Sequence, residues 1–199
     1  MGEINLIIAG VGGQGSVLAS HLVAIAAIRD GLHARVGETF GAAMRGGSVA
    51  SHVRLGKEVH SPLISKDGAE IILALEPLEG LRNSAKYLRE GGLLVTNTRA
   101  WSPTDVNIGL AEYPDMKTVE KSVKKLGGKA IIIDATSLAQ QAGNVRTMNV
   151  VMLGALAGTG KLPVSNESLK QVIRENVPKG TEEVNMRAFE LGLKSAQQR

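Results

Sequence analysis

The first part of the chain alternates short apolar runs with glycine-rich joints. Residues 4–9 form a continuous, partly β-branched apolar run, which is typical of a strand buried on both faces. Residues 16–30 are apolar almost all round and precede Gly31, so they predict a buried helix that ends at a glycine. Strand, glycine loop and helix in this order are the opening unit of a doubly wound α/β fold.

Further strands are predicted where short apolar runs recur. Residues 33–37 are expected to form a second strand, and the alternation over 48–55 predicts a half-exposed, antiparallel strand. Residues 61–64 read as the end or edge of a strand. The other predicted strands cover residues 71–75, 93–96, 108–112 and 130–133. Helices are predicted between them at 77–90 and 116–126, the first starting on a proline.

The pattern changes after about residue 135, where strand signals stop. Helices are predicted over residues 137–142, 148–157, 165–177 and 181–194, and Ser165 and Thr181 are suitable N-caps. We expect a single domain over residues 1–199, with an α/β part at 1–135 and a helical part at 136–199 packed on the sheet. The predicted fold class is a three-layer, Rossmann-like α/β unit with a mixed sheet.

Composition excludes several classes of function. The chain has no cysteine, so it offers no disulfide, no thiolate nucleophile and no cysteine ligand for an iron–sulfur cluster. The formal net charge of +4 is a mild excess. The most basic stretch, residues 117–129, lacks the aromatic side chains on which bases stack. We therefore expect no nucleic-acid partner.

The N-terminal segment carries no targeting signal that we can identify. The sequence MGEINLIIAG lacks a basic leader, and its apolar run is too short to span a bilayer. The expectation is a cytoplasmic protein without a membrane partner.

The first candidate site is the glycine loop GVGGQG at residues 10–15, which satisfies the pattern G-x-G-x-x-G between a strand and a helix. Glycines let the backbone approach a diphosphate, and the helix N-terminus supplies N–H groups to it. The residues predicted to bind a cofactor are Gly10, Gly12, Gly13, Gln14, Gly15 and Ser16. The alternative is a tight turn that only packs the strand against the helix.

The second candidate site is another glycine-rich loop, residues 38–48 (ETFGAAMRGGS). Arg45 offers a planar fork of donors that suits a carboxylate or phosphate. Gly46 and Gly47 would permit close approach of a ligand or a partner chain. Glu38 lies near the place where NAD-binding folds carry the acid that binds the ribose. The alternative is a surface turn with a solvated arginine.

Catalytic machinery is not evident in the sequence. Asn149, near the start of an apolar helix, reads most simply as a capping or core amide, with a role at a subunit interface as the alternative. The four histidines show no metal-ligand spacing, and no Ser-His-Asp set or carboxylate pair can be placed. We therefore predict no catalytic residue and no metal site, in a domain that binds or gates.

These motifs together resemble a known family. The segments GVGGQG, ETFGAAMRGGSVASHVRLG, HSPLI, NVVMLGALAG and NMRAFELG resemble the gamma-type domain of the 2-oxoacid:ferredoxin oxidoreductases, most of all the beta subunit of the indolepyruvate type. The resemblance covers residues 4–192. It implies an oxidoreductase subunit, inactive alone, in a complex that converts 2-oxo acids and coenzyme A to acyl-CoA, carbon dioxide and reduced ferredoxin. Aryl pyruvates such as indolepyruvate are the expected substrates.

The resemblance also implies a division of labour between chains. Thiamine diphosphate and [4Fe-4S] clusters are expected in a larger alpha subunit, through which the complex meets ferredoxin. This chain is expected to bind no cofactor tightly, although its glycine loop corresponds to one that helps hold coenzyme A in related pyruvate enzymes. The residues expected to face the partner or its active site are Glu38, Thr39, Arg45, Gly46, Gly47 and Asn149.

Two other functions remain open from the sequence. The glycine loop together with Glu38 would suit an NAD(P)-dependent oxidoreductase that acts alone. The absence of an evident catalytic set would suit a non-catalytic nucleotide-binding module.

Overall fold

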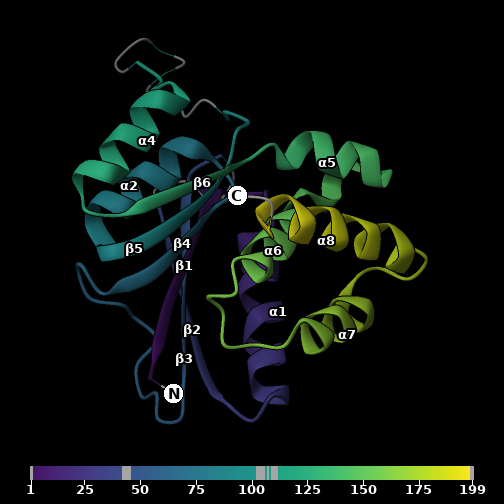
Figure 1. Cartoon of the computed structure of the whole chain (residues 1–199). Coiled ribbons are helices and arrows are strands. Elements are labelled where there is room, and N and C mark those ends of the chain that lie inside the picture. Colours follow the sequence, from purple (N-terminus) through teal and green to yellow (C-terminus); the bar gives the residue numbers. More distant parts are fainter. Residues whose placement is uncertain (1, 42–45, 102–105, 107, 109–111, 198–199) are drawn as a thin grey trace.

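The computed structural model describes residues 2–41, 46–101, 106, 108 and 112–197. A six-stranded sheet lies between two layers of helices, with the strand order β2-β3-β1-β4-β5-β6 (Figure 1). The strands are β1 (Ile4–Val11), β2 (His33–Phe40), β3 (Ser48–Gly56), β4 (Ala69–Ala74), β5 (Leu88–Asn97) and β6 (Lys129–Ile133). The strand expected at 108–112 falls largely outside the described residues.

The helices follow the predicted order closely. They are α1 (Ser16–Arg29), α2 (Pro77–Tyr87), α4 (Met116–Lys125), α5 (Ala135–Ala142), α6 (Met148–Gly158), α7 (Asn166–Asn176) and α8 (Glu182–Gln197), with a short 3-10 turn η1 (Val145–Thr147) before α6. The prediction was wrong for residues 88–90, which belong to β5 because Leu88 already pairs with Ala69 of β4.

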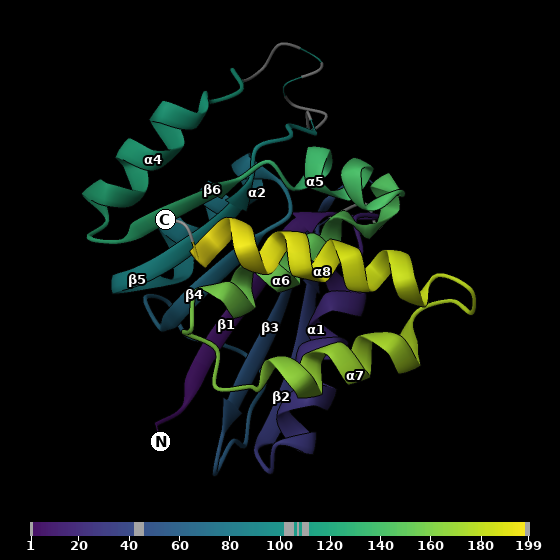
Figure 2. The ribbon, with the colours of Figure 1, turned by 45° about the vertical axis from the view of Figure 1, so that its right-hand side comes forward.

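The sheet is mixed, as predicted. β3 pairs antiparallel with both β1 and β2, whereas β1, β4, β5 and β6 are mutually parallel. Helices α1, α5, α6 and α8 cover one face, and α2 and α4 cover the other (Figures 1 and 2). The helices that follow β1 and β4 therefore leave toward opposite faces. In open α/β sheets this arrangement opens a crevice at the carboxyl ends of the strands.

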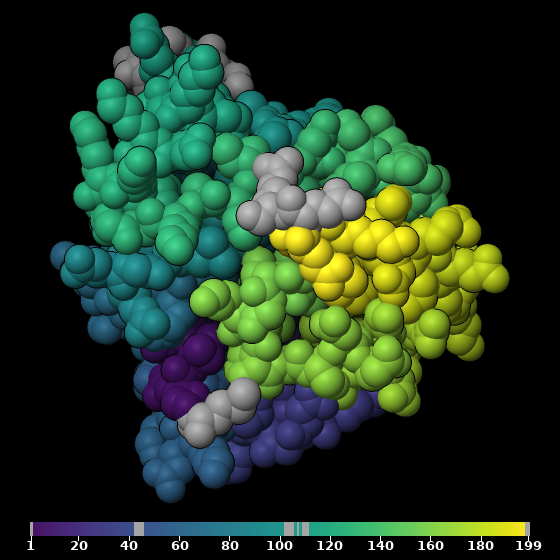
Figure 3. Space-filling view, in the orientation of Figure 1, coloured from purple at the N-terminus to yellow at the C-terminus, as the bar shows by residue number. Residues whose placement is uncertain are grey.

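The C-terminal helices share one hydrophobic core with the sheet. Leu6 and Ile8 of β1 belong to the same buried cluster as Val151 of α6 and Phe189 of α8. In Figure 3 these helices, in green and yellow, lie directly against the purple N-terminal segments. The predicted packing of a helical part on the sheet is therefore confirmed.

Helices α6 and α8 cross at glycines that bring their backbones together. A Cβ atom on Gly192 would overlap the carbonyl oxygen of Val151, and one on Gly154 would overlap the carbonyl oxygen of Phe189. Neither neighbour is the flexible end of a side chain, so neither can turn away. The crossing therefore needs glycine at both positions.

The prediction that β3 is half exposed was wrong. His52 and Ala50 lie on the face expected to meet solvent, but their exposed fractions are 1% and 5%. Residues 61–64 form no strand; they cross this face instead, and the Ile64 N–H donates to Nδ1 of His52 at 3.2 Å. The ring of Tyr87 from α2 stands edge-on to the imidazole, 5.1 Å between centroids. The polar side chain of His52 therefore makes a buried contact and does not face solvent.

We predict that Gly192→Ala destabilises the protein. The added methyl group would force α6 and α8 apart, and overpacking of this kind costs about 1–3 kcal/mol, with the unyielding backbone here favouring the upper end. Thermal unfolding monitored by circular dichroism would measure the loss. Gly56→Ala is the control, because its Cβ would meet neighbours only at ordinary distances of 3.4 Å or more. Equal unfolding temperatures for the two variants would contradict the prediction.

We predict that His52 makes the fold sensitive to mild acid. Burial, reinforced by the charge of Lys86, lowers the pKa of His52 in the folded state. Below about pH 6.5 the unfolded chain therefore binds a proton at His52 more readily than the folded chain does. The contribution of neutral His52 to the free energy of unfolding is complete above about pH 6.5 and is lost as the pH falls below it.

The test compares thermal unfolding of the wild type and His52→Asn from about pH 7.5 to about pH 5. Asparagine can offer an oxygen where Nδ1 accepts the Ile64 N–H, but it does not titrate. The variant should show a smaller drop in unfolding temperature over this range, and parallel curves would refute the role of His52.

Candidate functional site

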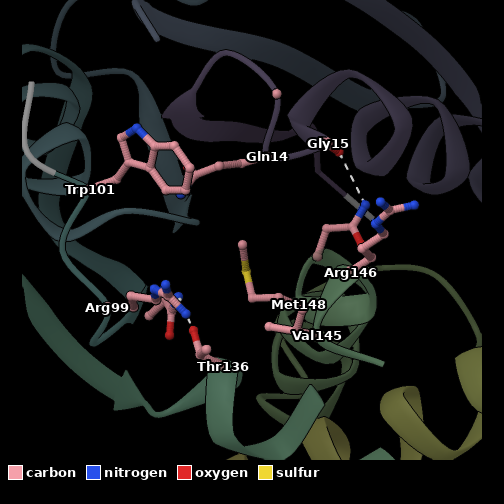
Figure 4. Close-up of a pocket in the computed structure, with 11 residues that line it drawn as sticks. Gln14, Gly15, Arg99, Trp101, Thr136, Val145, Arg146 and Met148 are labelled. Atoms are coloured by element: carbon pink, nitrogen blue, oxygen red, sulfur yellow. Dashed lines mark hydrogen bonds between the residues drawn. The ribbon is translucent and has the colours of Figure 1, made fainter. Parts of the chain in front are cut away.

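A cavity of about 420 Å³ lies at the carboxyl ends of β1 and β5. The glycine loop forms one side, the end of β5 and the chain after it a second, and the start of α5, the turn η1 and the start of α6 the remainder (Figure 4). Its lining residues are Gly13, Gln14, Gly15, Asn97, Arg99, Trp101, Thr136, Val145, Arg146, Met148 and Asn149. This is the crevice that the strand topology leads one to expect.

The glycine loop is a tight turn that also leaves a helix end free. The Val11 N–H donates to Oε1 of Gln14 at 2.8 Å, and the Gln14 N–H donates back to the Val11 carbonyl at 3.1 Å. Gly15 has a φ of 86° and is the N-cap of α1, with no side-chain capping bond. A residue with a Cβ would be strained there. The first N–H groups of α1 therefore remain available to an anion at the cavity.

The two glycine-rich loops of the sequence meet in space. The Gly12 N–H donates to the Gly47 carbonyl at 2.8 Å, and the Gly46 N–H donates to the Gly12 carbonyl at 3.2 Å. Both backbone groups of Gly12 are thus used within the protein and not offered to a ligand. Arg45 lies outside the described residues, but its neighbour Gly46 is bonded to the glycine loop.

Asn149 joins α6 to the glycine loop. Its Nδ2 donates to the Gly15 carbonyl at 3.4 Å, and its Oδ1 accepts the N–H of Val150 at 2.9 Å. A Cβ on Gly15 would lie 2.5 Å from this Nδ2. Asn149 is 6% exposed, so one buried amide fixes the start of α6 against the start of α1.

The charged residues among the described lining are two arginines, Arg99 and Arg146, with no carboxylate beside them. Figure 4 places Arg146 on the side of the cavity opposite Arg99 and Trp101, with the thioether of Met148 between. The indole of Trp101 is 53% exposed and forms an apolar wall. Two separated cations, a free helix N-terminus and an aromatic wall suit an anion with a planar group.

The floor of the cavity is held by Asn97 at the end of β5. Its Nδ2 donates to the Leu75 carbonyl and to Oγ1 of Thr136, both at 3.3 Å, and its Oδ1 accepts the N–H of Ala135 at 3.1 Å. Asn97 is 1% exposed. This side chain therefore fixes β4, β5 and α5 relative to one another.

The structure divides the predicted cofactor-binding residues into two groups. Gly13, Gln14 and Gly15 line the cavity. Gly10 belongs to β1, and Ser16 is a buried residue at the first position of α1, so neither is part of the lining.

Glu38 and Thr39 lie away from the glycine loop. Both belong to β2, and β3 lies between β2 and β1, a separation of about 10 Å across two strand spacings. Oε1 of Glu38 lies 3.9 Å from Nε2 of His21. An acid that binds the ribose of NAD stands on the strand next to the glycine loop, so this geometry does not support that role for Glu38.

A second cavity of about 320 Å³ lies on the opposite helical layer, between β2, β3 and α2. Thr39 and Ser48 line it together with Glu79. Glu79 is 2% exposed and accepts bonds from Oγ of Ser48 at 2.5 Å and from Nη1 of Arg82 at 2.8 Å. This cavity therefore borders the end of the 38–48 loop.

Several lining residues were missed by sequence reasoning. Asn97 is the last residue of β5, and Thr136 comes shortly after β6, so the rule that ligands bind at carboxyl strand ends could have found them. Arg99, Trp101 and Arg146 belong to connecting segments without a motif, and only the fold brings them to the glycine loop.

Within the described ranges, no three His, Cys, Asp or Glu side chains are grouped as metal ligands would be. No helix in that part of the chain is long and apolar enough to cross a lipid bilayer.

Comparisons with known proteins agree with this architecture. Residues 5–195 match the family model described as "Pyruvate ferredoxin/flavodoxin oxidoreductase". The chain is 47% identical to the indolepyruvate oxidoreductase subunit IorB of Thermococcus kodakarensis, over 100% of this chain and 98% of that protein. It is 44% identical to the subunit of the same name from Pyrococcus horikoshii, with the same coverage.

A solved structure shows the same fold. The crystal structure of the keto/oxoacid ferredoxin oxidoreductase gamma subunit from Geobacter sulfurreducens superposes with a TM-score of 0.74 at 25% identity, covering 98% of this chain and 99% of that one. The chain therefore belongs to the pyruvate ferredoxin/flavodoxin oxidoreductase family, as a gamma-type subunit of a 2-oxoacid:ferredoxin oxidoreductase.

Proposed function

We propose that this chain is the cluster-free subunit of an indolepyruvate:ferredoxin oxidoreductase and that its cavity holds part of coenzyme A. The observation that carries the proposal is the cationic cavity beside the glycine loop. The names of the two IorB relatives support indolepyruvate or a related aryl pyruvate as the substrate of the complex.

The lining of the cavity fits the nucleotide end of coenzyme A. Arg99 and Arg146 would bind its phosphates, and the free N–H groups at the start of α1 would add to them. Trp101 offers an apolar wall for the base. A volume of about 420 Å³ suits part of this long molecule, so the pantetheine arm would extend out of the cavity toward the partner chain.

The remaining chemistry would belong to the partner. Without cysteine, this chain has no thiolates for an iron–sulfur cluster. A larger alpha subunit would hold thiamine diphosphate and the [4Fe-4S] clusters that pass electrons to ferredoxin. Thiamine diphosphate stabilises the carbanion left when carbon dioxide departs. The task of this chain is then to bind and orient coenzyme A, so that its thiol reaches the acyl group held on the partner.

We predict that Arg146→Ala weakens the use of coenzyme A by the assembled complex. Loss of a charge-assisted bond to phosphate costs about 1.5–3 kcal/mol, which corresponds to a rise of about 10- to 100-fold in the KM for coenzyme A. The kcat at saturating coenzyme A should change little, because the guanidinium touches no reacting atom.

The measurement is steady-state acyl-CoA formation by the reconstituted complex. Arg174→Ala, on the exposed face of α7, removes the same charge far from the cavity and should leave the KM unchanged. An unchanged KM in Arg146→Ala would count against coenzyme A in this cavity.

The loop that carries Arg45 gives a further prediction. Gly46 and Gly47 are bonded to Gly12, so we propose that Arg45 faces the partner near the path of coenzyme A. Arg45→Ala should lower turnover or loosen assembly, and size-exclusion chromatography together with acyl-CoA formation would separate these effects. Wild-type values for both would remove Arg45 from the site.

A further inference from the structure

A buried carboxylate stands directly behind the cavity. Glu76 follows β4, is fully buried, and is the N-cap of α2. Its Oε2 accepts the N–H of Glu79 at 2.8 Å, which is the ordinary work of a capping side chain.

The other carboxylate oxygen does something that capping does not require. Oε1 of Glu76 accepts a short hydrogen bond from the hydroxyl of Tyr113 and another from the backbone N–H of Trp101, the latter at 3.3 Å. Burial raises the pKa of Glu76, while these hydrogen bonds lower it in part. A single carboxylate thus ties together α2 and two points of the chain that lie twelve residues apart.

The backbone of Trp101 is bonded to this carboxylate. The last hydrogen bond of the preceding segment to the sheet runs from the Thr98 N–H to the Ile133 carbonyl, at 3.0 Å. Beyond it, the hydrogen bond described for Trp101 is the one to Glu76. Tyr113 is fixed to the same place, since its hydroxyl also accepts the Leu78 N–H at 3.4 Å. We call Glu76, Trp101 and Tyr113 the carboxylate clasp.

Of the three residues of the clasp, Trp101 lines the cavity. In Figure 4 the indole of Trp101 lies on the edge of the open space, above Arg99. It is the largest apolar surface among the lining residues, and about half of it is exposed. A large exposed indole in a cavity that is also lined by two arginines matches a planar base joined to phosphates.

We propose that Glu76 is a positioning residue whose clasp holds Trp101 as a platform on which the purine base of the bound coenzyme A stacks. The ligand in this statement rests on the proposed function. The clasp itself rests on hydrogen bonds that are present without any ligand. Glu76 therefore acts on the ligand through Trp101 and not by contact.

The alternative role for Glu76 is purely structural, as the cap of α2. The two roles use different oxygens, so they can be separated by substitution at Tyr113. Tyr113→Phe removes the hydrogen bond to Oε1 but leaves the bond between Oε2 and the Glu79 N–H in place. Tyr87→Phe is the matched control, because the Tyr87 hydroxyl takes part in no hydrogen bond among the described residues.

The first experiment uses the fluorescence of the purified full chain, in which Trp101 is the one tryptophan. Quenching by acrylamide reports how accessible the indole is to solvent. Because Trp101 is 53% exposed with the clasp closed, Tyr113→Phe should raise the quenching constant by up to about twofold, and Tyr87→Phe should not. Equal quenching in wild type and Tyr113→Phe would overturn the clasp, whatever the ligand.

The second experiment tests the platform with adenosine 3′,5′-bisphosphate, pantetheine and whole coenzyme A. Trp101→Ala should weaken binding of the bisphosphate and of coenzyme A by about five- to 100-fold in calorimetry, the range expected for loss of one base–aromatic stack. Trp101→Phe should restore most of this affinity, and any affinity for pantetheine should be unaffected. In the assembled complex, Tyr113→Phe should raise the KM for coenzyme A and leave kcat nearly unchanged.

The outcomes separate this proposal from the one on which it rests. If coenzyme A binds the wild type and Trp101→Ala equally while Arg146→Ala binds it weakly, the platform is wrong and the cavity still holds coenzyme A. If neither coenzyme A nor the bisphosphate binds the free chain, and the KM of the complex responds to neither substitution, both proposals fail. Glu76→Gln provides a second clasp variant should Tyr113→Phe fold poorly.

Discussion

The site depends on the parallel pairing of β1 with β4, whose following helices leave toward opposite faces of the sheet. Were α1 and α2 on the same face, one helix would cover the carboxyl ends of both strands. Because they diverge, the glycine loop after β1 and Glu76 after β4 stand side by side at an open crevice, each at the start of a helix. α1 begins at a glycine without a side-chain cap, whereas α2 begins at a buried carboxylate. The start of α1 can therefore bind an anion from outside, whereas the start of α2 is already capped by the side chain of Glu76.

The C-terminal helices complete the crevice. Asn149 at the start of α6 bonds to Gly15, and α6 is in turn held against α8 at glycines that admit no side chain. The wall that carries Arg146 is thus connected to the core of the molecule through backbone contacts and one amide. On the opposite side, the hydrogen bond described for Trp101 runs from its backbone N–H to the carboxylate of Glu76.

Sequence reasoning predicted the fold well where the signal is local. The run from β1 through the glycine loop to α1 is contiguous, and apolar period and glycine placement decide it. The sequence signal was weaker where a residue is buried by segments that are distant from it in the sequence. His52 is a polar residue in an alternating strand, so it indicated solvent, yet residues 61–64 and Tyr87 cover it. For the site, Gly13 to Gly15 and Asn149 were predictable, but Arg99, Trp101 and Arg146 come from segments far away in the sequence and carry no pattern.

The contacts of Gly12 explain why the pattern G-x-G-x-x-G alone left two interpretations open, a diphosphate site and a turn that only packs the strand against the helix. In a dinucleotide site, the glycines of this loop exist so that a diphosphate can approach the backbone. Here both backbone groups of Gly12 are bonded to Gly46 and Gly47, so part of the loop serves to attach the second glycine-rich loop. Only its last residues, Gly13 to Gly15, face the cavity. The same six residues therefore do two tasks. They attach the 38–48 loop through Gly12, and they leave the start of α1 open to the cavity at Gly13 to Gly15.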